Sequence, residues 1–141
     1  MEWSIFEHEH PSVIIENKQM EGIPYLLVSP KEMKEARPVI IYYHGWHSSK
    51  DFKRFEAMTI ASFGYRVIVP DALYHGDRGT IDYDAPDSID RYLWEVVFHS
   101  VSESNSLISH LEESYGIKED QVIVMGSSMG AMIAAGVFSK N

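Results

Sequence analysis

Apolar residues in this chain fall into short runs separated by polar or turn-forming segments. The first two runs, residues 13–16 and 23–28, flank the turn-prone pair Glu21-Gly22, which predicts an antiparallel hairpin. Pro24 suits a hairpin at a sheet edge, where it costs no central hydrogen bond. Three later runs, residues 38–43, 65–69 and 122–125, are apolar at nearly every position, which is typical of strands covered on both faces.

Between these runs the apolar residues recur at helical spacing. A helix is predicted from Asp51, as its cap, through Phe52, Phe55 and Met58 to an end at Gly64. Residues 88–115 predict one long amphipathic helix or two in series, and a third helix follows residue 130. The charged segment 31–37 is predicted to be a solvated loop.

The order hairpin, strand, helix, strand, helix, strand, helix predicts the α/β class. We expect a doubly wound, mostly parallel sheet with an N-terminal antiparallel hairpin, formed by residues 1–141 as one domain.

Composition and net charge argue against several classes of partner and site. A net charge of −9 argues against nucleic acid or an anionic membrane as partner, because both need a basic face. The chain has no cysteine, hence no disulfide and no thiolate metal site. The sequence shows neither a signal peptide nor an apolar run of membrane-spanning length, so a cytoplasmic location is expected. No metal-ligand constellation or phosphate-cradling loop is present, and we expect no cofactor.

The segment from Gly126 to Gly130 carries the main candidate chemistry. It follows the apolar run 122–125 and precedes a helix-prone run, and it has the pattern glycine, any residue, serine, any residue, glycine. In such a strand–turn–helix the serine hydroxyl stands above the sheet, and the helix N-terminus faces the position where negative charge develops in acyl transfer. Ser128 is therefore predicted to be a nucleophile. The simpler alternative is a serine that only caps the helix.

Three motifs together resemble the α/β-hydrolase superfamily, and more narrowly the amino-terminal part of small bacterial carboxylesterases of the prolyl-oligopeptidase-like branch. They follow three successive predicted strands: His44-Gly45-Trp46 with Lys50, Asp71 with His75-Gly76-Asp77-Arg78, and Gly126-Ser127-Ser128-Met129-Gly130-Ala131. The resemblance covers the chain from about residue 38 onward.

The resemblance implies roles for individual residues. The backbone N–H groups of Trp46 and Met129 would form the oxyanion hole, although Trp46 could also simply fill space beside the sheet. His44 with Gly45, and Asp71 with His75, are expected to support the chain around the site as structural residues.

In that superfamily an acidic residue and then a histidine follow the nucleophile in the chain. Neither residue type occurs between Ser128 and Asn141, so the triad's acid and base are expected to be absent and turnover by this chain alone very low. His75 is the internal candidate for a base. The strand 122–125 would lie at a sheet edge, which predicts self-association through it.

The sequence therefore predicts a serine carboxylesterase that hydrolyses short acyl esters through an acyl-enzyme on Ser128. An amidase, thioesterase or peptidase on the same scaffold is the alternative within enzymes. A non-catalytic hydrolase fragment that acts as an interaction partner is the alternative outside them.

Overall fold

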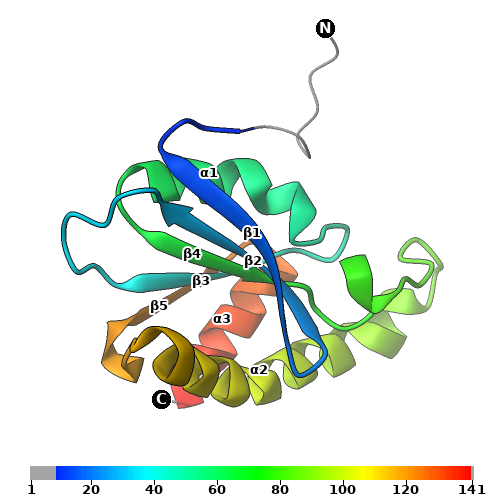
Figure 1. The fold of residues 1–141 in the computed structure, drawn as a ribbon. Helices are drawn as coiled ribbons and strands as arrows, with labels where there is room; N and C mark the ends of the chain where they lie inside the picture. Colours follow the sequence, from blue (N-terminus) through cyan, green and yellow to red (C-terminus); the bar gives the residue numbers. More distant parts are fainter. Residues whose placement is uncertain (1–8, 141) are drawn as a thin grey trace, which may run out of the picture.

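The computed structural model describes residues 9–140, so the N-terminal segment tested for a signal peptide lies largely outside it. Five strands form one mixed sheet in the order β1-β2-β4-β3-β5 (Figure 1). The outer pair is antiparallel, β2 is antiparallel to β4, and β4, β3 and β5 are parallel. The strands are β1 (Val13–Met20), β2 (Ile23–Pro30), β3 (Val39–Tyr43), β4 (Arg66–Pro70) and β5 (Val122–Gly126).

The predicted hairpin is present and longer than expected. Glu21 and Gly22 form its two-residue turn with φ values of 47° and 80°, the left-handed pair that matches the twist of antiparallel strands. β1 is the edge strand and β2 is internal. Pro24 of β2 lies just outside the ladder with β4, which begins with Tyr25 opposite Pro70.

Helices cover both faces of the sheet, as expected for a doubly wound α/β fold (Figure 1). α1 (Arg54–Ser62) packs on one face, and α2 (Ser88–Tyr115) and α3 (Met129–Lys140) pack on the other. β3 is buried along its whole length because its side chains alternate between these two cores, with Ile40 on the α1 side and Ile41 on the α2 and α3 side. The continuous apolar pattern of this strand is thereby explained.

The long periodic segment forms one helix of 28 residues, not two. Gly116 ends α2 in the left-handed conformation, with φ 67°, and its N–H donates to the carbonyl of Glu112. Within residues 9–140 no helix is both long and apolar enough to cross a bilayer.

The predicted start of the first helix is wrong. Asp51 does not cap it: a short 3₁₀ helix, η1 (Asp51–Lys53), comes first, and the Asp51 carboxylate pairs with the ammonium of Lys50 at 3.1 Å. Phe52 and Phe55 are half exposed, whereas the small residues Ala57 and Ala61, with Met58, face the sheet.

β5 lies at the edge of the sheet and pairs only with β3 among the described strands. Its Ile123 side chain is 45% exposed, and Phe138 on the neighbouring helix α3 is 77% exposed. An open groove beside the strand is lined by apolar side chains from α2, β5 and α3, such as Ile108 and Val124, and by charged ones such as Glu112. This part of the molecule therefore presents both unpaired strand backbone and apolar surface.

The contact between α2 and α3 gives a test of the packing. A Cβ atom on Gly136 would lie 2.6 Å from Cγ2 of Val101, whose χ1 is restricted. Gly136→Ala should therefore lower the free energy of unfolding by about 1–2 kcal/mol, although alanine normally stabilises a helix. Urea unfolding measures this loss of stability in Gly136→Ala, both alone and combined with Val101→Ala, which removes the methyl group that the new Cβ would meet. An unchanged or increased stability in the single variant would contradict the packing.

Candidate active site

Ser128 occupies the turn between the end of β5 and the start of α3. Its φ is 55°, one of three positive values at non-glycine residues in the described chain, and its side chain is exposed. A non-glycine residue in the left-handed region costs on the order of 1–3 kcal/mol, so the surrounding structure has to hold it there. The predicted serine turn is thus present, with the serine side chain at the surface.

The two glycines of this turn permit close backbone contacts. A Cβ on Gly126 would collide with the carbonyl group of Gly130, and a Cβ on Gly130 would collide with the carbonyl group of Tyr43 at the end of β3. Real Cβ atoms essentially never approach other atoms so closely, and both obstacles are backbone. Only glycine at these positions lets α3 begin directly against the ends of β5 and β3.

The turn after β3 lies against the serine turn. A Cβ on Gly45 would be 3.6 Å from Cβ of Ser128 and 3.4 Å from the carbonyl oxygen of Ser127. The next residue, Trp46, and the residue after the serine, Met129, are both buried. Within residues 9–140 the backbone N–H groups of Trp46 and Met129 donate to no protein acceptor.

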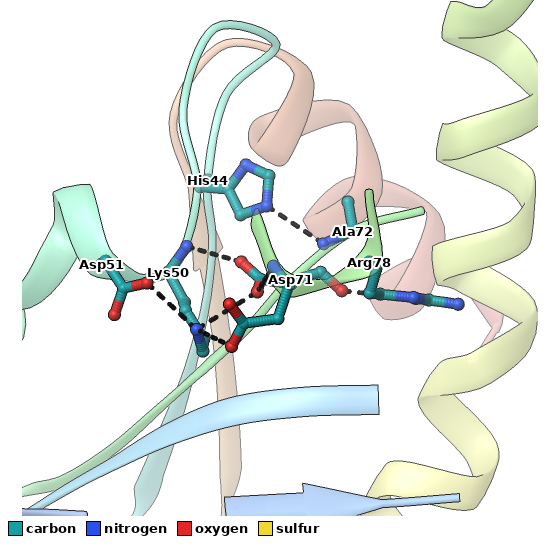
Figure 2. Close-up of polar contacts among 7 residues, drawn as sticks. His44, Lys50, Asp51, Asp71, Ala72 and Arg78 are labelled. Carbon is teal, nitrogen blue, oxygen red and sulfur yellow. Dashed lines mark hydrogen bonds and ion pairs between the residues drawn. The ribbon is translucent and has the colours of Figure 1, made fainter. Parts of the chain in front are cut away.

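His44 is a buried residue held by backbone on both sides of its ring. The N–H of Ala72 donates to Nε2 at 3.0 Å (Figure 2). Nδ1 therefore carries the proton and donates to the carbonyl of Gly45 at 2.8 Å. Burial lowers the pKa of His44 to about 4, despite the opposing effect of the Gly45 carbonyl. The ring is neutral at pH 7 and links the turn after β3 to the loop after β4.

His75 is fully buried, and both of its ring nitrogens are engaged. Nε2 lies 2.7 Å from the carbonyl oxygen of Trp46, and Nδ1 lies 2.7 Å from that of Leu73. The ring could accept a proton from Ser128 only after breaking one of these contacts and turning out of the interior. The geometry therefore argues against His75 as the base.

Asp71 is the centre of a buried polar cluster between the loops after β3 and β4 (Figure 2). Its carboxylate accepts hydrogen bonds from the backbone N–H groups of Lys50 and Asp77, each at 2.9 Å, and lies 3.3 Å from the Lys50 ammonium. The Lys50 side chain is only 2% exposed and also contacts Asp77 at 2.7 Å and Asp51 at 3.1 Å. Burial lowers the pKa of Lys50, but the contacts with Asp77, Asp51 and Asp71 outweigh it, so the pKa lies above its ordinary value.

Two contacts that the sequence analysis did not identify fasten these loops to the rest of the molecule. Arg78 donates to Glu103 on α2 at 2.8 and 3.1 Å, and to the carbonyl of Asp71 at 3.3 Å. The indole N–H of Trp46 donates to the carbonyl of Tyr83 at 3.2 Å. The Arg78–Glu103 and Trp46–Tyr83 contacts join residues 25 and 37 positions apart, and no local sequence pattern predicts them.

The carboxylates of Asp51, Asp71 and Asp77 surround the Lys50 ammonium, which takes the place that a bound cation would need. No group of three histidine, cysteine, aspartate or glutamate side chains in the described part of the chain could hold a metal ion.

The buried imidazole of His44 should make stability depend on pH. Its pKa is lower in the folded state, about 4, than the ordinary value of 6.5, so the unfolded chain binds more protons between these values. The free energy of unfolding should therefore fall as pH falls from 6.5 to 4, by about 3 kcal/mol from this group. Urea unfolding at several pH values should show a shallower dependence for His44→Gln. An undiminished slope in His44→Gln would contradict the assignment.

Comparison with known proteins agrees with this architecture. Residues 23–141 match the model of the dienelactone hydrolase family. The chain is 31% identical over 126 residues to the putative esterase YitV of Bacillus subtilis, covering 89% of this chain and 49% of that protein. It is 34% identical over 128 residues to the esterase YjfP of Escherichia coli, covering 90% of this chain and 50% of that protein. The chain thus spans about half the length of these relatives.

Solved structures show the same fold at low sequence identity. A cold-adapted esterase from an Arctic intertidal metagenomic library matches with a TM-score of 0.70 at 20% identity, covering 100% of this chain and 62% of that one. TT1662 from Thermus thermophilus matches with a TM-score of 0.69 at 22% identity, covering 91% of this chain and 52% of that one. The family match spans residues 23–141, and the sheet order and the sharp turn at Ser128 agree with it. The chain therefore belongs to the dienelactone hydrolase family of the α/β-hydrolase superfamily.

Proposed function

We propose that this chain carries the nucleophile and the oxyanion hole of a serine carboxylesterase that acts on short acyl esters. The observation that carries the proposal is the exposed Ser128 in a left-handed turn, with the backbone of Gly45 packed close to its Cβ. The residues that follow Gly45 and Ser128, Trp46 and Met129, have backbone N–H groups that donate to no protein acceptor within residues 9–140. The esterase names of the relatives YitV and YjfP support an ester as substrate. By the motif around His44, we place the chain in the prolyl-oligopeptidase-like branch.

In the proposed reaction the Ser128 hydroxyl oxygen attacks the ester carbonyl carbon, and its proton passes to a base. The π electrons of the carbonyl move onto its oxygen, which accepts hydrogen bonds from the N–H groups of Trp46 and Met129. Each such donor stabilises the transition state by about 2.7–4 kcal/mol. The intermediate collapses: the bond from the carbonyl carbon to the ester oxygen breaks, the departing alkoxide takes the proton from the base to become the alcohol, and Ser128 is left acylated. Water then cleaves the acyl-enzyme, releasing the acid and restoring the hydroxyl.

Residues 9–140 place no general base beside Ser128. Both ring nitrogens of the buried His44 and His75 are engaged with backbone groups, so neither is free to take the proton. The resemblance assigns the acid and the base to positions after the nucleophile. We therefore propose that turnover of esters by this chain alone is very low. The Ser128 hydroxyl should still react with strongly electrophilic reagents, which depend less on a base.

A second proposal concerns association. β5 leaves one side of its backbone unpaired at the sheet edge, and exposed apolar side chains such as Ile123 and Phe138 flank it. Such an edge is a template for pairing with another strand. We propose that the chain self-associates through residues 122–125.

A fluorophosphonate probe tests the proposed nucleophile. The phosphonyl group should attach to Ser128 with loss of fluoride, because its tetrahedral phosphorus directs an oxygen towards the proposed N–H donors as the oxyanion of the ester reaction would. Mass spectrometry of tryptic peptides should show labelling of the parent protein and of Ser127→Ala, and its loss in Ser128→Ala. Labelling at another residue, or none in a folded sample, would contradict the proposal and favour the non-catalytic alternative.

Size-exclusion chromatography with light scattering tests the association. The parent chain should form dimers or larger species at high concentration, and Ile123→Lys should shift it towards monomer because a charge at the edge opposes strand pairing. Phe63→Lys is the matched control, since it replaces an exposed apolar side chain, 72% exposed, away from β5. A parent chain that stays monomeric would refute the proposal.

A further inference from the structure

His75 has an arrangement that the reaction proposed above does not explain. The side chain is 0% exposed and lies in the loop that follows β4. Three rings surround it: Tyr83 stacks on it at 4.8 Å between centroids, His44 lies at 5.1 Å, and Trp46 presents an edge at 5.5 Å. The ring is thus held in one orientation, away from water.

Both ring nitrogens face groups that can only accept a hydrogen bond. Nε2 is 2.7 Å from the Trp46 carbonyl oxygen, and Nδ1 is 2.7 Å from the Leu73 carbonyl oxygen. A neutral imidazole has a single N–H, so it would leave one nitrogen lone pair directed at a carbonyl oxygen. An imidazolium donates to both oxygens, and 2.7 Å is within the range of charge-assisted hydrogen bonds.

The ionisable groups facing the ring are consistent with a positive charge at this place. His44, on the turn after β3, is neutral because its Nε2 accepts from Ala72, so it adds no like charge. The Tyr83 phenol lies on the segment before α2 and donates to the carbonyl of Tyr74. Within the loop of His75 itself, the buried Asp71 carboxylate lies against Gly76 and is paired with the Lys50 ammonium at 3.3 Å, so the carbonyl contacts are what favour the charge.

The contact to Trp46 connects His75 with the oxyanion hole. The carbonyl of Gly45 accepts from the N–H of Ser48 at 3.1 Å and from His44 at 2.8 Å. Because the peptide group is planar and trans, a fixed Gly45 carbonyl also fixes the Trp46 N–H, which points the opposite way. His75 holds the next peptide through the Trp46 carbonyl. The two histidines therefore restrain both peptide groups that flank the Cα of Trp46.

We propose that His75 is a buried imidazolium that holds the carbonyl of Trp46 and thereby helps to position the N–H of the same residue in the oxyanion hole. The effect of His75 on the reactivity of Ser128 rests on the proposed function, whereas the protonation of its ring and its contact with the Trp46 carbonyl do not. His75 acts as a positioning residue: it touches the backbone of the donor residue and takes no proton from Ser128.

Nitrogen-15 NMR of the histidine side chains in the folded chain tests the protonation directly. At pH 7 both ring nitrogens of His75 should carry protons, whereas His44, as the internal comparison, should carry one, on Nδ1. A His75 ring with one unprotonated nitrogen would overturn the proposal. This readout requires no activity and no variant.

Replacement tests the positioning. In His75→Gln, which retains at most one of the two contacts, the Trp46 amide resonance should shift, and Ser128 should react with the fluorophosphonate about 10- to 100-fold more slowly. His10→Gln, an exposed substitution just before β1, at the opposite edge of the sheet from β5, should leave both readouts unchanged. An unaltered Trp46 amide and labelling rate in folded His75→Gln would overturn the positioning role. If Ser128 of the parent chain is not labelled, the proposed function fails, and the Trp46 amide decides the inference about His75.

Discussion

The site depends on one close contact between two backbones, where the first turn of α3 lies against the end of β3. The carbonyl of Tyr43 accepts the N–H of Ser127 at 3.3 Å, and the same carbonyl leaves no space for a side chain on Gly130. Because β3 and β5 are parallel neighbours with Tyr43 opposite Gly126, their carboxyl ends lie together. This contact places Ser128 and the N–H of Met129 beside the turn that carries Trp46.

Buried polar groups then hold the loops that complete the site, since these loops have little regular secondary structure. Asp71 joins the backbone at Lys50 to the backbone at Asp77, and Arg78 joins the same loop to Glu103 on α2. Removing one partner of a buried ion pair leaves the other charge unpaired, which costs about 3–5 kcal/mol. That cost reports the charge left unpaired, not a net gain from the ion pair, so the cluster fixes the loop geometry because breaking it is unfavourable.

The sequence predicted most of the fold and the position of the serine turn, because both depend on local patterns. The continuous apolar run of β3 indicated a strand buried on both faces, and the spacing of glycines around Ser128 indicated the strand–turn–helix. Asp51 was wrong as a helix cap because its carboxylate pairs with Lys50, a contact that competes with the local capping signal. The link between Arg78 and Glu103, and the two carbonyl contacts of His75, depend on segments that only the folded sheet brings together. The branch of carboxylesterases and the roles of Trp46 and Met129 stay predictions.

The central claim is that two backbone N–H groups converge on the position where an oxyanion forms at Ser128. A crystal structure of the chain with a phosphonyl group attached to Ser128 tests this most directly. The account predicts the non-bridging phosphonyl oxygen about 2.7–3.1 Å from the backbone nitrogens of both Trp46 and Met129. A phosphonyl oxygen that points to solvent, or that contacts only one of these nitrogens, would contradict it.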